Sequence, residues 1–187
     1  MQRLLLLFMA ILVYVPAQAT TVLRLSVEEM ARRADLVVRA EVTRVEVQSD
    51  PTDEARITTH VTMRVLDTFK GHQTAPTLTL KLLGGSNGRY ILRVPGMPTF
   101  SQGEEVVLFL HATPRGFMPA GLWLGKYKVL RGEGPARAVR IPADCKTFTL
   151  EGGKLAEDVG VSHGDDSLDL DVLVRRIRAG ATMGGGR

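Results

Sequence analysis

The 187-residue chain has one cysteine, few aromatic residues and no apolar run long enough to span a membrane. A single cysteine excludes an intrachain disulfide framework and any zinc site built from several cysteines. The longest apolar run covers residues 4–15, whereas a transmembrane helix needs about 20 residues. With 24% charged and 44% hydrophobic residues, the chain has the composition of a globular protein, which excludes wholesale disorder.

The sequence also lacks a region in which charge of one sign is concentrated. Without Arg3, 23 basic and 20 acidic residues remain, spread evenly over both halves. A nucleic-acid surface would show clustered basic residues with interleaved aromatics. The one basic cluster, residues 175–178, falls in the last turn of a predicted helix, where it complements the helix dipole. We therefore expect no nucleic-acid partner.

Residues 1–19 have the three parts of a secretory signal sequence. A basic start is followed by the apolar run and a proline, and Ala17 and Ala19 form the small-x-small pattern that precedes a cleavage site. We expect cleavage after Ala19, a secreted or periplasmic chain of residues 20–187, and no stable membrane insertion after cleavage. An uncleaved membrane anchor is the alternative, which the short apolar run disfavours.

The remaining pattern is that of one mainly β domain, residues 20–180, followed by a disordered tail, residues 181–187. Ser26 and Glu29 form a capping box that opens a short N-terminal helix. Ser167 is expected to cap a C-terminal helix. Strand patterns cover residues 36–48, 56–69, 77–83, 90–94, 104–111, 117–124, 126–130, 136–141 and 146–150. Alternation predicts antiparallel pairing for most of them.

The first predicted strand changes the parity of its apolar positions. Val42 belongs to an even-numbered set, whereas Val45 and Val47 are odd. A strand that keeps one face buried can do this only through a bulge or a sharp coil, which we place at Thr43 and Arg44. Long first strands with such a break are typical of small closed barrels.

Three segments form recognisable motifs. Residues 34–42 match an "ADVV-x-A-x-V" opening, Phe69-Lys70-Gly71 match a "K-G" strand end, and residues 103–110 match a "G-x-x" apolar strand. In these segments the chain resembles netrin-like modules and tissue inhibitors of metalloproteinases. The resemblance implies an OB-like antiparallel β-barrel with helices packed at its side. Those inhibitors begin with a disulfide-pinned cysteine that chelates zinc, whereas the expected start here is Thr20, so the resemblance does not extend to that mechanism.

Further motifs are spread over most of residues 26–130. They lie in residues 26–42, 69–71, 84–85, 94–100, 103–110 and 121–129. These segments resemble the "SLEEL-x-x-x-ADLVV", "LKG", "GG", "V-x-G-x-P-x-F-x-x-GE-x-x-LFL" and "G-x-x-G-x-(F/Y)-x-V" motifs of a group of uncharacterised exported bacterial proteins. This resemblance implies export and brings no established activity.

Candidate catalytic and metal-ligating residues are scattered. His60, His72, His111 and His163 show no paired spacing, so we expect no metal and no cofactor.

The other candidates also have ordinary explanations. Cys145, beside Lys146, is expected to be an idle or buried thiol. The alternatives are a reactive thiol and an interchain disulfide. The acids at Asp165, Asp166, Asp169 and Asp171 lack the EF-hand pattern and fit a helix start. Residues 84–89 lack the ending of a phosphate-binding loop.

Two segments are candidates for recognition. Trp123 lies between Gly121 and Gly125, close after Phe117, and this stretch is expected at the mouth of the barrel, with core packing as the alternative for the tryptophan. The loop of residues 93–100 is rich in proline and glycine and contributes Arg93, Met97 and Phe100, although it is also explained as the path into the next strand.

From these patterns we expect a secreted, non-enzymatic module that binds a protein or peptide, with a protease as one candidate. The alternatives are an envelope structural or assembly protein, and a hydrolase that uses His60, His111 and dispersed aspartates. Clustered His and Asp side chains in a cleft would favour the hydrolase, and an exposed apolar patch near Trp123 would favour the binding module. The oligomeric state is open.

The export prediction has a direct test. When the full chain is expressed in a secreting bacterial host, intact-mass analysis of the exported protein should find a species that starts at Thr20, because signal peptidase accepts Ala17-Gln18-Ala19. Replacing Ala19 by a bulky residue should abolish that species. A mature protein that retains residues 1–19 would contradict the prediction.

Overall fold

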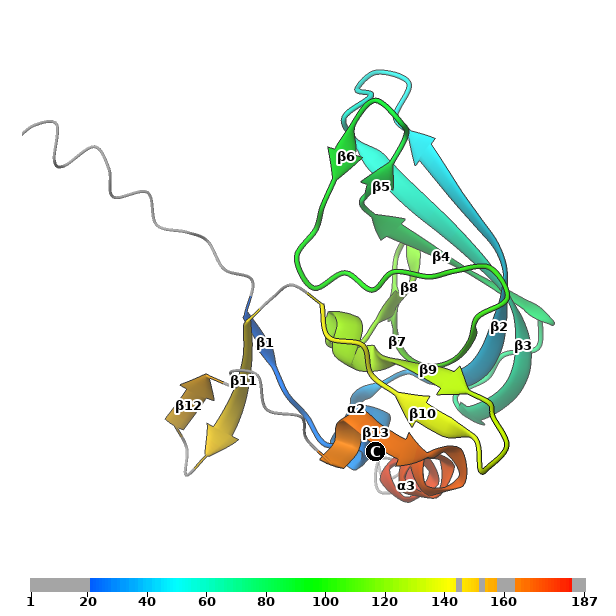
Figure 1. The fold of residues 1–187 in the computed structure, drawn as a ribbon, viewed down its shortest axis with the longest axis vertical. Coiled ribbons are helices and arrows are strands. Elements are labelled where there is room, and N and C mark those ends of the chain that lie inside the picture. The colour runs from blue at the N-terminus through cyan, green and yellow to red at the C-terminus, as the bar shows by residue number, and fades with distance from the viewer. Residues whose placement is uncertain (1–20, 144–145, 152–153, 158–163, 183–187) are drawn as a thin grey trace, which may run out of the picture.

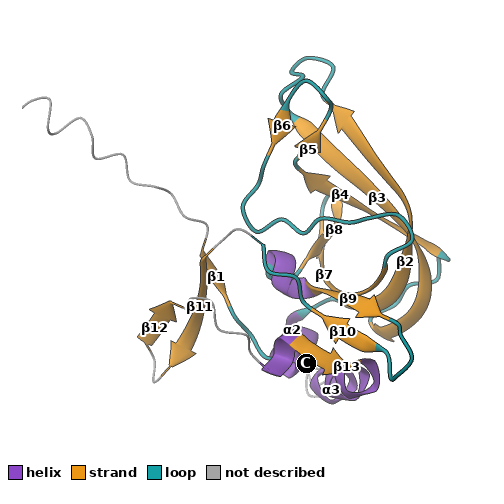
Figure 2. Ribbon diagram, viewed as in Figure 1, coloured by secondary structure: helices purple, strands orange, loops and turns teal. Residues whose placement is uncertain are grey.

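The computed structural model describes residues 21–143, 146–151, 154–157 and 164–182, and it shows a mainly β fold with two α-helices (Figures 1 and 2). This confirms the predicted fold class. The short helix α2, Val27–Arg33, lies near the start, and α3, Leu170–Thr182, lies near the end. Among the described residues, no helix combines the length and the apolar character needed to cross a membrane.

Five strands are paired in a ring. They are β2 (Leu36–Ser49), β3 (Ile57–Lys70), β4 (Thr77–Leu83), β8 (Gly116–Pro119) and β7 (Glu105–Thr113), and β7 pairs back with β2. The step from β4 to β8 is parallel and consists of the single pair Leu80 and Phe117. No continuous ladder therefore closes the barrel, and the result is the partly open five-stranded arrangement of OB-like folds.

Other strands extend or accompany this ring. The large sheet continues from β7 through β9 (Lys126–Leu130), β10 (Arg137–Val139) and β13 (Ser167–Asp169). β5 (Gly85–Ser86) and β6 (Ile91–Leu92) form a two-stranded pair, and β1 (Thr21–Leu23), β11 (Lys146–Glu151) and β12 (Lys154–Glu157) form a separate sheet. The short 3₁₀ turns are η1, Leu122–Gly125, and η2, Gly164–Asp166.

Two apolar cores lie on opposite sides of β2 and β7. Val38 of β2 and Leu108 of β7 face the barrel interior, whereas Val37 and Phe109 face the second core beneath α2 and α3. Successive strand residues point to opposite faces, so both strands are buried on both sides. This explains the unbroken apolar run Val106–Leu110 and confirms that β7 is a central strand.

The predicted irregularity in the first long strand is present. The β2–β3 register shifts between Val42 and Arg44, at the expected position, and it shifts twice more nearer the start of β2. Beyond the break, Val45 is half-buried, but Val47 is exposed, because β2 continues past the barrel core there. The parity argument therefore located the bulge but overestimated the burial of Val47.

Three expectations are corrected. Ser167 does not cap α3, because residues 167–169 pair with β10 as β13 and the helix begins at Leu170. Ala181 and Thr182 belong to that helix, so they are not part of a disordered tail. The predicted strand 117–124 ends at Pro119 and becomes η1, which contains Trp123. The expected signal sequence, Cys145, His163 and residues 183–187 lie outside the described residues.

Lys70 and Gly71 join the barrel to the N-terminal helix. The Lys70 ammonium donates hydrogen bonds to the carbonyl oxygens of Ala31, Arg32 and Ala34, at 2.7–2.9 Å. A cation there satisfies the last carbonyls of α2 and complements its dipole. Gly71 has a φ of +82°, and a Cβ on it would lie 2.4 Å from the Asp35 carbonyl oxygen. The "K-G" segment thus has a structural role.

We predict that Lys70→Met lowers the free energy of unfolding by about 1–2 kcal/mol, because three carbonyls lose a charged donor. Chemical denaturation of the purified protein measures this change. Lys81→Met, at an exposed lysine on neighbouring β4, is the control and should change stability little. Equal effects of the two substitutions would contradict the capping role of Lys70.

Candidate functional site

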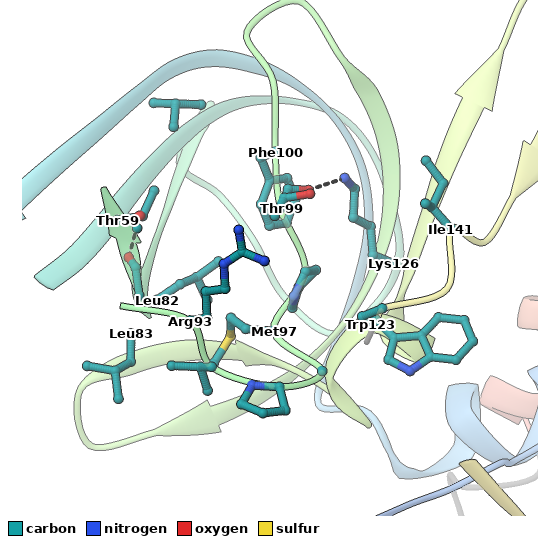
Figure 3. A pocket seen from close by; sticks show the side chains of 18 of the residues that line it. Thr59, Leu82, Leu83, Arg93, Met97, Thr99, Phe100, Trp123, Lys126 and Ile141 are labelled. Atoms are coloured by element: carbon teal, nitrogen blue, oxygen red, sulfur yellow. Dashed lines mark hydrogen bonds between the residues drawn. The ribbon is translucent and has the colours of Figure 1, made fainter. Parts of the chain in front are cut away.

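A pocket of about 660 Å³ lies at the mouth of the barrel. We call it the mouth pocket (Figure 3). It is bounded by the far ends of β2 and β4, the β5–β6 pair, the loop of residues 93–101, η1 and β9, and residues 141–143. Its volume falls in the range of about 300–1,000 Å³ that is usual for ligand sites.

The loop 93–101 is held in place by backbone hydrogen bonds at its centre. The Trp123 amide of η1 donates to the Gly96 carbonyl at 3.0 Å, and the Met97 amide donates to the Val94 carbonyl at 3.1 Å. Gly96 has a φ of +79°, which favours glycine. The loop is therefore a defined wall of the pocket.

A buried ion pair lies at the base of this wall. The Lys126 ammonium is 2.9 Å from the nearer Glu104 carboxylate oxygen, donates to the Thr99 carbonyl, and sits 4.3 Å from the centre of the Phe100 ring. The Ser101 amide donates to the same carboxylate at 3.1 Å. Burial lowers the pKa of Lys126, and the attraction of Glu104 opposes that effect. These contacts tie the loop to β9.

Large exposed apolar side chains gather around the mouth pocket. Ile91 is 68% exposed, Ile141 57% and Leu83 45%, and Val47 is also exposed. They come from separate segments: β6, the stretch after β10, β4 and β2. Most aliphatic side chains of this size are buried in globular proteins, and contiguous exposed patches mark binding surfaces. These four side chains therefore form an apolar surface around the mouth pocket that the barrel core does not bury.

Four of the five predicted binding residues line this pocket. They are Arg93, Met97, Phe100 and Trp123. Phe117 does not line it; it pairs with Leu80 on the neighbouring strand β4 and packs against the interior core. Trp123 lies at the pocket edge but is only 3% exposed and belongs to the core beneath the helices. Core packing, the alternative raised for the tryptophan, describes its position.

The pocket also contains residues that the sequence did not single out. Leu83, Ile91 and Ile141 each followed an ordinary strand pattern, and nothing local distinguished them from core residues. Glu104 and Lys126 are far apart in sequence and looked like ordinary surface charges. The only available signal was the glycine-rich and proline-rich composition around residues 84–98, which marked the loops but not their partners.

The dispersed candidates for catalysis do not meet in this pocket. His60 lies on β3, His111 lies on β7 at 3.5 Å from Asp35, and neither lines the pocket. Asp165 and Asp166 form ion pairs with Arg176 and Arg24, respectively. Within the part of the chain that the structure describes, no three His, Cys, Asp or Glu side chains are grouped as metal ligands would be.

Comparison with known proteins adds no relative to this picture. No protein-family model matches the chain, and no curated protein matches it significantly.

The buried ion pair gives a pH-dependent prediction. Glu104→Gln should lower the free energy of unfolding at pH 7 by about 2–4 kcal/mol, because it leaves the Lys126 charge buried without its partner. The pKa of Lys126 should then fall further below its ordinary value of 10.5. Between the lowered pKa of Lys126 in the folded variant and 10.5, the unfolded chain holds a proton that the folded chain has released. The stability of the variant therefore rises with pH in this window, so its stability deficit relative to the unsubstituted protein should shrink as the pH rises towards 10.5.

Denaturant unfolding at pH 7 and at higher pH measures both effects. The neighbouring substitution Glu105→Gln is the control, since Glu105 contacts Arg39 and Arg131 at a more exposed position. It should cost about 0.2–1 kcal/mol. A deficit in Glu104→Gln that does not change with pH would show that Lys126 is not the group responsible.

Proposed function

We propose that the protein is an exported, non-enzymatic module that binds a protein or peptide at the mouth pocket. The observation that supports this most directly is the exposed aliphatic group of Leu83, Ile91 and Ile141 around a concave site. Ligand pockets are mostly apolar with a few convergent polar groups, and this pocket has that composition.

The geometry of the walls also favours binding. The Lys126–Glu104 pair and the Trp123–Gly96 hydrogen bond hold the loop against β9. A wall that is already ordered loses little conformational entropy when a ligand binds, and this raises affinity for a given contact area. Export is the second part of the proposal and rests on the pattern of residues 1–19 and on the resemblance to exported bacterial proteins.

Affinity capture from the envelope fraction of the source cells, followed by mass spectrometry and titration of the captured partner, tests the proposal. Leu83→Ser should weaken saturable binding about tenfold or more, because burial of a leucine side chain contributes about 1.5–3 kcal/mol. Leu130→Ser is the matched control: Leu130 is 46% exposed, Leu83 is 45% exposed, and Leu130 lies outside the mouth pocket.

Trp123→Ala is unsuitable as a binding test because the side chain is part of the core and its loss should destabilise the fold. Two results would contradict the proposal. One is the absence of any saturable partner, and the other is equal binding by the Leu83 and Leu130 variants.

A further inference from the structure

The mouth pocket carries an excess of positive charge. Its lining includes three basic residues, Arg93, Lys126 and Lys128, and one acid, Glu104. The acid is bound to Lys126 at 2.9 Å and receives the Ser101 amide as well, so its charge is already compensated. Within the described part of the chain, neither Arg93 nor Lys128 forms an ion pair. The pocket therefore presents two uncompensated cations among aliphatic side chains.

The two cations come from different segments of the pocket lining. Arg93 is exposed on the loop after β6, and Figure 3 shows its guanidinium extending into the pocket. Lys128 lies on β9, two residues after Lys126, and alternation along a strand places both lysines on the same face. The positive potential of Lys128 also contributes to lowering the pKa of Lys126, which agrees with their proximity. An anion in the pocket would thus meet positive charge from two segments of its lining.

Apolar side chains lie on both sides of the pocket. In Figure 3 the Arg93 side chain lies beside Leu82 and Leu83, and Ile141 lies on the other side of the pocket, beyond Lys126. A fatty acid carries its carboxylate at one end of a single chain, which would leave one apolar side empty. A peptide with an acidic residue between apolar residues places apolar groups on both sides of the charge.

We propose that the mouth pocket recognises an extended peptide segment in which an acidic side chain is flanked by apolar residues. Arg93 and Lys128 bind the carboxylate, and Leu83, Ile91 and Ile141 contact the flanking side chains. This inference rests on the proposed binding function and specifies its ligand class. Arginine suits the role because its planar guanidinium donates two parallel hydrogen bonds to one carboxylate.

Three pools of fluorescein-labelled pentapeptides test this proposal. Each pool has valine, leucine, isoleucine or phenylalanine at the outer positions, and glutamate, glutamine or lysine at the centre. Fluorescence anisotropy with the purified protein should show the glutamate pool binding about tenfold more tightly than the glutamine pool, because a charge-assisted contact contributes about 1.5–3 kcal/mol. The lysine pool should bind most weakly. High salt should reduce the preference, because salt screens exposed charges.

Variants then assign the charge preference to residues. Arg93→Gln should remove most of the preference for glutamate over glutamine. Arg115→Gln is the matched control, since it removes one exposed positive charge outside the pocket and should leave the preference intact. Lys128→Gln removes the second cation and should also reduce the preference for glutamate. This variant provides the test if circular dichroism shows that the Arg93 variant is poorly folded.

The outcomes separate this inference from the function on which it rests. Binding by all three pools with equal affinity, or an unchanged preference in both pocket variants, would overturn the acidic-peptide assignment and leave peptide binding standing. Binding by no pool would count against the proposed function itself. Decanoate that binds more tightly than the glutamate pool would show a fatty-acid site and would also overturn the assignment.

Discussion

The rest of the structure depends on the burial of β2 and β7 on both faces. Val38 and Leu108 require a covered barrel interior, and Val37 and Phe109 require a second cover outside it. The second cover is supplied by α2 and α3, which come from opposite ends of the described chain and are linked by the ion pair of Glu28 with Arg176. Because α2 precedes β2 directly, its end must be fixed, and the Lys70 ammonium from β3 does this. The strands β2 and β7 are thus packed between the barrel interior and the helices.

The incomplete closure of the barrel coincides with the mouth pocket. β4 and β8 pair at one position only, Leu80 with Phe117. The end of β4 near Leu83 is therefore not paired with β8. The loop between β6 and β7 lies across that end, and its side chains together with β9 enclose the mouth pocket (Figures 1 and 3). A fully paired barrel of this size would be filled by its own side chains. The apolar recess lies where the strand pairing stops, beside a loop that is held by backbone hydrogen bonds.

Electrostatics distinguishes residues that look equivalent in the sequence. Lys126 and Lys128 are two positions apart, but among the described residues only Lys126 of the two has a carboxylate partner. Lys126 therefore stabilises the fold, and the charge of Lys128 is left for a ligand. Arg93 and Arg140 differ in the same way: Arg93 is exposed at the pocket, whereas Arg140 is 2% exposed and lies 3.5 Å from Asp166. Burial determines which cations need a partner within the fold.

The sequence by itself determined the features that depend on neighbouring residues. The cap at Ser26, the alternation of Leu78, Leu80 and Leu82, the bulge near Thr43 and the double-sided burial of β7 are all read from periods of two or of three to four residues. Loop 93–100 was also recognisable, from its proline and glycine. Only the tertiary structure decided that Ser167 pairs as a strand, that Trp123 is in the core, and that Leu83, Ile91 and Ile141 surround a pocket with Arg93 and Lys128. These outcomes depend on contacts between segments far apart in the chain, and local periodicity carries no information about which segments meet.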